Sequence, residues 1–276
     1  MARRRGMEPT KQASLSSASD WFAIRDVQVK LEQLPRVVGE GLGLTVPVKD
    51  FELGRDVGVV PPSQLPPKPG LFKTEGQARL LHDLASIELQ ATELAVRTLV
   101  EFPDAPKDFR NELAELAVSE GRHLQLCLDG MNDLGFPWGS WDVHLTLWNA
   151  VSPEDSLLDR ILIVHRYLEG SGLDAGESIL RRMQGVKALR ARPVVETIVR
   201  EEVDHVHFGS RWYRRTAEAL RLDPDKDFEH RIAKVAREVP RRERLAHDLR
   251  RRAGFTETEL SILERFSENP NRCTNV

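Results

Sequence analysis

Two Glu-x-x-His sequences are the residues best suited to bind a metal ion. One begins at Glu120 and ends at His123, and the other begins at Glu202 and ends at His205. Residues three apart on a helix point to the same side, so each pair can present a carboxylate and an imidazole to one cation. Both glutamates lie in apolar runs of helical spacing, where an unpaired charge costs several kcal/mol. A solvated helix face therefore does not explain them.

Two further glutamates, Glu88 and Glu169, also interrupt apolar helical faces. Glu88 precedes Glu120 by 32 residues, and Glu169 precedes Glu202 by 33. Each pair would lie at one height in an antiparallel helical hairpin, because residues equally far from the turn lie level. The midpoint of the first pair falls in a proline-containing turn at residues 103–106. Four carboxylates and two imidazoles are thus expected at one level, enough to ligate two divalent metals.

Four helices must position these side chains. Apolar residues recur at helical spacing after residue 77, no strand pattern competes there, and an aromatic-rich connection spans residues 135–154. One Glu from each of two helices and Glu-x-x-His from each of the other two form the ligand set of ferritin-like di-iron and di-manganese proteins. The predicted fold is therefore all-α, a ferritin-like four-helix bundle with one long crossover. The predicted helices span residues 77–102, 108–134, 155–183 and 192–222.

The rest of the chain is expected to flank this bundle. Residues 1–70 are predicted to form an irregular N-terminal arm, ending in a strap with five prolines within residues 61–70. Proline fixes φ and donates no hydrogen bond, so the strap is expected to be extended. The bundle itself is assigned to residues 71–222. A C-terminal extension covers residues 223–276, with short helices expected at 227–252 and 256–268.

The chain resembles the ferritin-like DUF455 proteins in several motifs. The run from Leu84 to Ala95 is similar to the first-helix signature of that family, and the two Glu-x-x-His segments and the Leu168-Glu169 pair match later signatures in order. The resemblance covers about residues 55–215. It implies a dinuclear site for iron, with manganese and iron together or manganese alone as alternatives, and it implies little about the reaction. The implied metal ligands are Glu88, Glu120, His123, Glu169, Glu202 and His205.

Several neighbours of the predicted ligands could support them. His165 and Arg166 lie one turn before Glu169 and could orient it or bind an anionic substrate group, although a salt bridge on the helix surface is the alternative for both. Tyr167 is a further candidate of the same kind. Glu93 and Glu201 fall off the apolar faces and are expected to be solvated or to contact a ligand from outside.

Three glycines, Gly170, Gly172 and Gly176, follow Glu169 inside the third predicted helix. Each destabilises a helix interior by about 1 kcal/mol relative to alanine, so their presence needs a reason. Either a partner packs closely there, or the helix forms a π-bulge beside the site. A regular hydrogen-bond ladder through residues 166–178 would exclude the second explanation.

Composition excludes several other classes of protein. The 276 residues carry 40 basic and 43 acidic side chains, a net charge of −3, so polyanion binding is not indicated. Two cysteines exclude a disulfide scaffold and a cysteine-rich metal site. No apolar run is long enough to span a membrane, and no apolar segment follows the arginines at the start, so a cytoplasmic location is predicted.

The predicted function is oxidation of a small organic substrate by a dinuclear metal centre that activates O₂ or a peroxide. Ferroxidase activity or iron binding without an organic substrate is the alternative, and a pocket leading to the metals would favour the enzyme. A third reading, a tRNA-modifying hydroxylase, draws on residues 181–276, which hold 22 basic and 16 acidic side chains. Nucleic acid and membranes are otherwise not expected as partners, and a homo-oligomer stays open.

Overall fold

The computed structural model describes residues 18–49, 51–186, 190–238 and 243–268. These residues form helices and their connections, and within these ranges there is no strand, only an isolated bridge between Val59 and Val143. The all-α prediction is therefore confirmed. None of the helices in the described ranges has both the length and the apolar character that crossing a bilayer requires.

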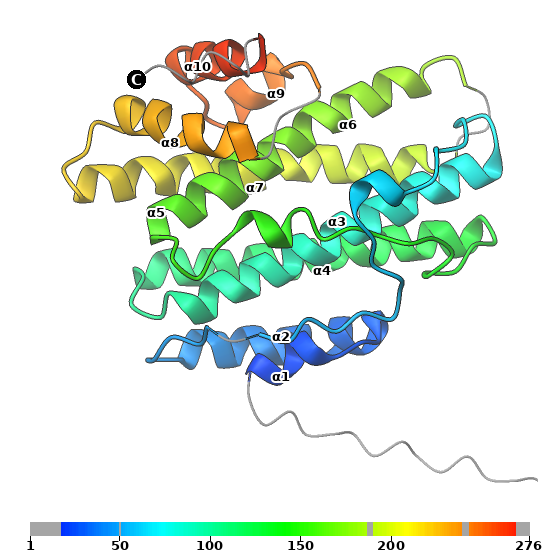
Figure 1. Ribbon diagram of the computed structural model, residues 1–276, viewed down its shortest axis with the longest axis horizontal. Coiled ribbons are helices and arrows are strands. Elements are labelled where there is room, and N and C mark those ends of the chain that lie inside the picture. Colours follow the sequence, from blue (N-terminus) through cyan, green and yellow to red (C-terminus); the bar gives the residue numbers. More distant parts are fainter. Residues whose placement is uncertain (1–17, 50, 187–189, 239–242, 269–276) are drawn as a thin grey trace, which may run out of the picture.

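Four long helices lie at the centre of the molecule (Figure 1). In chain order α3 packs on α4 and α6 packs on α7, while contacts between α4 and α7 join the two pairs. The connection between α4 and the third predicted helix contains the short 3₁₀ helix η2 (Trp148–Ala150). The bounds agree with the predicted ones to within a few residues, except that the third predicted helix is divided. They are Thr74–Glu101 for α3, Lys107–Asp133 for α4, Glu169–Met183 for α6 and Arg192–Ala219 for α7.

The third predicted helix has three parts. It begins as α5 (Leu157–Arg160), where Ser156 and Asp159 form a capping box, and continues as the π-helix η3 (Ile161–Leu168). The Glu169 N–H donates to the carbonyl of Val164, five residues back, and α6 follows as a regular α-helix. The sequence predicts a π-distortion among the glycines, and the structure places it immediately before them.

Close packing explains two of the three glycines that follow. A Cβ atom on Gly170 would lie 2.8 Å from Nη1 of Arg250, and one on Gly176 would lie 2.3 Å from Cγ2 of Val199. A side chain at either position would force a neighbour to move. The corresponding space at Gly172 is open, because nothing lies within 4 Å of the position that a Cβ would take there.

The irregular N-terminal arm is a wrong prediction, since its described residues include two helices. These are α1 (Ala18–Ala23) and α2 (Val27–Gly43), and Asp26 caps α2 by accepting from the backbone of Gln28 and Val29. The buried residues of α2 recur at helical spacing, but its three glycines and one proline lower the helix propensity and make this pattern hard to recognise in the sequence. α2 packs on α3 and α4, and the space left by Gly121 admits Leu34. The proline strap contains one short 3₁₀ helix, η1 (Pro62–Gln64).

Glu93 ties this N-terminal segment to the central helices. It is fully buried on α3, and its carboxylate pairs with both Lys30 of α2 and Arg55. The expectation that Glu93 is solvated or contacts a ligand is therefore wrong. Lys30 and Arg55 belong to the segment predicted to be irregular. Their charges stabilise the Glu93 carboxylate in place of the hydrating water that an exposed carboxylate would bind.

In the described part of the chain, three helices follow α7 and cover the other side of the central pairs, at the top of Figure 1. They are α8 (Pro224–Glu238), α9 (His247–Arg252) and α10 (Glu257–Glu268). α8 and α9 contact α7, and α10 packs on α8. Buried ion pairs fasten them: Arg166 of η3 binds Glu259 of α10, and Arg250 of α9 binds Asp174 of α6.

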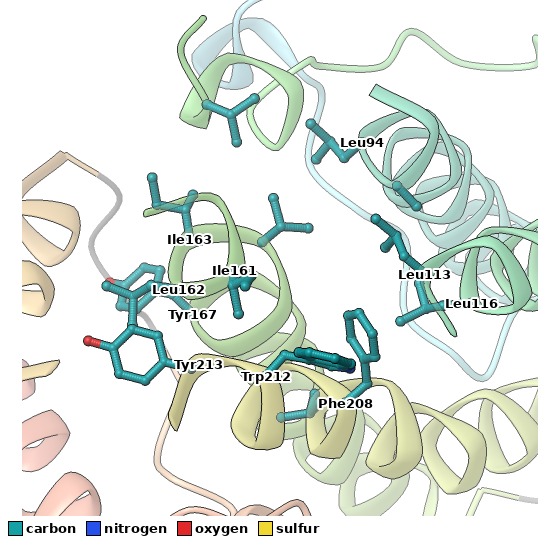
Figure 2. Close-up of a cluster of buried hydrophobic side chains, with 14 of the residues drawn as sticks. Leu94, Leu113, Leu116, Ile161, Leu162, Ile163, Tyr167, Phe208, Trp212 and Tyr213 are labelled. Carbon is teal, nitrogen blue, oxygen red and sulfur yellow. The ribbon is translucent and has the colours of Figure 1, made fainter. Parts of the chain in front are cut away.

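The apolar core consists of two clusters. The larger contains residues from Leu94 onward on α3, up to Ala117 on α4 and from Val203 onward on α7, with side chains of η3 between them (Figure 2). The smaller contains residues up to Leu89 on α3 and from Leu124 onward on α4. The predicted metal ligands lie between the two clusters, at the level where apolar side chains give way to carboxylates.

Candidate metal centre

Glu120, His123, Glu202 and His205 come together in the middle of the helices. One ligand atom from each lies within 4.8 Å of all the others, and all four residues are buried. Nδ1 of His205 lies 2.8 Å from Oε1 of Glu120 and 3.3 Å from Oε2 of Glu202. Nδ1 of His123 lies 3.6 Å from the other oxygen of Glu120. Glu120 thus stands between the two imidazoles with one oxygen toward each.

The other two predicted ligands lie at the edge of this group. Oε2 of Glu88 is 3.7 Å from Nδ1 of His123, so Glu88 joins the cluster on the side of that imidazole. Glu169 is nearer to His165, whose Nδ1 lies 2.7 Å from its Oε1. Its charge still contributes to raising the pKa of Glu202, after burial and the charge of Glu120. The structure therefore brings all six predicted residues to one region, with Glu169 held by a histidine of its own helix.

A buried group of this composition could hold a metal ion. Both oxygens of Glu120 and Nδ1 of both cluster histidines are buried and make no directed hydrogen bond, although oppositely charged groups lie nearby. Buried polar atoms are nearly always hydrogen-bonded, so a convergent set of buried polar atoms without directed hydrogen bonds needs a partner. Carboxylate oxygen and imidazole nitrogen are ligands for iron, manganese and zinc alike. The donor set fits a divalent cation and does not select among them.

The outer nitrogens of the two imidazoles have reciprocal partners. Nε2 of His123 lies 3.0 Å from Oε2 of Glu201, and Nε2 of His205 lies 3.0 Å from Oγ of Ser119. Glu201 and Ser119 each directly precede the glutamate of a Glu-x-x-His sequence, and each reaches the histidine of the other helix. Such partners fix the ring so that its free nitrogen faces the metal position. The two halves differ, because one histidine has a carboxylate partner and the other a hydroxyl.

The three predicted neighbours of Glu169 have different roles. His165 contacts Glu169 as expected. Arg166 does not, because its guanidinium is bound by Glu259 and lies against Phe255 and two further rings. His165 lies four residues before Glu169 and contacts it. Arg166, three residues before Glu169, would share its face on a regular α-helix, but the π-helix η3 changes that spacing, and Arg166 faces α10 instead. Tyr167 contributes its ring to the larger apolar cluster (Figure 2).

Burial and the charges within the cluster raise the pKa values of several of its groups, so that these groups hold protons near neutral pH. Burial raises the pKa of Glu88 to about 8, and burial together with the charge of Glu120 raises the pKa of Glu202 to about 7. Burial alone would lower the pKa of His123, but Glu120 and Glu88 outweigh it and raise this pKa to about 10. Metal ligation needs deprotonated ligands, so binding a cation here must release protons and must weaken as the pH falls.

The raised pKa of Glu88 predicts how the metal-free protein responds to pH. Above the unfolded-state pKa of a glutamate and below about 8, the folded chain holds a proton that the unfolded chain has lost. The free energy of unfolding then falls by about 1.4 kcal/mol per pH unit relative to a chain without this group. Denaturant unfolding with a chelator at pH 5, 6, 7 and 8 should show wild type losing stability relative to Glu88→Gln. Parallel pH profiles for the two proteins would contradict the prediction.

A cavity of about 310 Å³ opens beside the candidate centre. The carboxylates of four predicted ligands, Glu88, Glu120, Glu169 and Glu202, lie in its wall, and most of the other lining residues are aliphatic. This volume lies at the lower end of the range for small-molecule sites. A molecule bound in the cavity could therefore contact the candidate centre, because packed side chains do not enclose the centre on all sides.

The comparisons with known proteins concern most of the chain. Residues 28–261 match the family model described as "Protein of unknown function (DUF455)", which includes α2 and most of the C-terminal helices as well as the central four. A Haemophilus influenzae protein described as uncharacterized is 29% identical over 240 residues, covering 84% of this chain and 80% of that protein. The chain belongs to the DUF455 family.

Proposed function

We propose that this protein is an oxidoreductase with a dinuclear metal centre, iron or manganese and iron, in a ferritin-like four-helix bundle. The ligands would be Glu88, Glu120, His123, Glu169, Glu202 and His205. When bound, two such metals supply activation of O₂ or a peroxide for oxidation of an organic substrate. The observation that carries the proposal is the cavity, because four carboxylates line a space large enough for a small molecule.

The residues around this centre would have different roles. Glu120 lies between both imidazoles and would help to hold the metals there, while Glu201 and Ser119 fix the rings from outside. His165 is placed to orient Glu169. The apolar walls of the cavity exclude water from the reacting groups, which strengthens electrostatic interactions inside the site. These features favour an enzyme over a protein that only stores or carries iron.

Metal content and iron turnover test the proposal together. Protein loaded anaerobically with Fe(II) and passed through a desalting column should retain two iron ions per chain, and the Glu88→Ala variant fewer. After exposure to O₂, the wild-type protein should oxidise only its bound pair and should need a reductant before it reacts again. Absence of retained metal in both proteins would overturn the proposal. Continued oxidation of added Fe(II) would assign the protein to the ferroxidases instead.

A further inference from the structure

Gly172 differs from the other glycines of α6 in what its missing side chain provides. Packing requires the absence of a side chain at Gly170 and Gly176, where Arg250 and Val199 occupy the space. At Gly172 no atom lies within 4 Å of the position that a Cβ would take, and the residue lines the cavity. A glycine inside a helix is less favourable than alanine, so packing and helix stability do not explain it. Gly172 is exposed where it lines the cavity, so a side chain there would extend into the open space of the cavity instead of against packed neighbours.

The cavity is long and follows two helices. On α3 its lining residues recur on almost every turn from Gly76 to Leu94, and on the opposite wall they continue along α6 as far as Arg182. The twelve residues from Gly76 to Glu88 correspond to about 18 Å at the helical rise of 1.5 Å per residue. The carboxylates of Glu88 and Glu169 thus lie far inside, and the outer end is near Lys68 and Arg182.

The wall between these ends is mostly aliphatic, and the carboxylate of Asp83, which lies between Leu80 and Leu84 on α3, is paired with Lys68 and Arg79. The aliphatic side chains include those of Leu80, Leu84, Ile87, Ala175, Ile179 and Val195. A ligand with polar groups along its length would lose hydrogen bonds to water there without replacing them. Exposed charged side chains, those of Lys68, Arg182 and Glu243, occur where the cavity nears the surface. The lining suits a molecule with a hydrocarbon middle and a polar group at its outer end.

We propose that the cavity binds one extended acyl or alkyl chain, whose polar head stays near Lys68 and Arg182 and whose hydrocarbon reaches the carboxylates. Gly172 keeps the channel open at its middle. An extended chain advances about 1.2 Å per bond, so about 15 bonds span 18 Å. This inference rests on the proposed function for the identity of the substrate site, and it names the substrate class as a fatty acid or a similar unbranched chain.

Binding of two fatty acids to the iron-loaded full-length protein tests the length of the channel. Each buried methylene should tighten binding by about fourfold, so dodecanoate, with six more methylenes, should bind on the order of 1,000-fold more tightly than hexanoate. Equilibrium dialysis below the concentration at which dodecanoate aggregates measures both dissociation constants. Equal affinity for the two acids would overturn the proposal, because a channel of this length buries more of the longer chain.

A pair of glycine variants locates the binding in the channel. Gly172→Leu should weaken dodecanoate binding at least tenfold, and Gly39→Leu, at an exposed α2 glycine that also has nothing within 4 Å, should leave it unchanged. Ala175→Met narrows the same channel and serves if Gly172→Leu does not fold. Iron content is measured on each protein. If dodecanoate binds but no iron is retained, the proposed function is wrong and the channel proposal stands. If iron is retained and both Gly172→Leu and Ala175→Met bind dodecanoate like the wild type, the channel proposal is wrong.

Discussion

Glu120→Ala is expected to weaken metal binding more than any other single substitution in the protein. Glu120 is fully buried, and its two oxygens face the imidazoles of His205 and His123 at 2.8 and 3.6 Å. Loss of a partner that only orients a ligand weakens a metal site about 10- to 100-fold, so loss of a carboxylate between both histidines should exceed 100-fold. Metal analysis after desalting should find almost none in the variant.

A second glutamate on the same helix provides the control for this experiment. Glu115 is exposed on α4, and Glu115→Ala should retain the wild-type metal content. Because the alanine at position 120 also removes the charge partner of both imidazoles, circular dichroism must show that the variant is folded. A folded Glu120→Ala protein with the full metal content would show that the cluster is a buried ion-pair network and not a metal centre.

The six candidate ligands could be predicted because ionisable residues are unusual within apolar helix faces. Carboxylates are rarely fully buried without a partner, and Glu120 and Glu202 both stand in apolar stripes. The spacing of Glu88 and Glu169 from them then predicts all four at one height, and in the structure all four carboxylates line one cavity. This inference needs only the helical repeat and the position of the turns. It does not need the packing of one helix pair on the other.

Features that depend on this packing could be predicted only in part. The sequence allows Glu201 to contact a ligand from outside, but which histidine Glu201 and Ser119 reach depends on how α4 and α7 contact each other. Glu93 lies off the apolar face of its helix, where a residue is usually solvated, yet it is buried because Lys30 and Arg55 pair with it. The helix that supplies Lys30 escapes prediction, because glycine and proline lower helix propensity while tertiary packing decides the outcome.

The arginines near the C-terminus show the same limit. The sequence places Arg250 among three consecutive arginines, a pattern expected for a solvated helix face, but Asp174 binds it in the interior. The partner lies 76 residues away in the chain, so no local pattern announces the pair. Arg166 is buried in the same manner by Glu259, 93 residues away. A charged residue that is buried with a distant partner resembles a surface residue until the fold is known.

Outside the metal centre, Glu259→Ala is expected to be strongly destabilising. Arg166 donates two hydrogen bonds to Glu259, at 2.9 and 2.8 Å, and both residues are fully buried. Removing the carboxylate leaves a guanidinium in the interior, which costs about 3–5 kcal/mol. For a chain of this size, the melting temperature should fall by about 10 °C. Glu257→Ala on the same helix removes an exposed pair with Arg251, and the melting temperature should stay close to that of the wild type.

The double variant Arg166→Met/Glu259→Leu separates two explanations for this loss. If the orphaned guanidinium causes it, apolar replacement of both partners should restore most of the stability, since buried ion pairs are often exchanged for hydrophobic residues without loss. The rings of Phe228 and Phe255, which lie 4.7 and 4.4 Å from the guanidinium, would then pack against methionine. If instead the ion pair itself fixes α10 to η3, the double variant should remain as unstable as Glu259→Ala. We expect recovery, because the surrounding aromatic side chains already form an apolar pocket that does not require a charge.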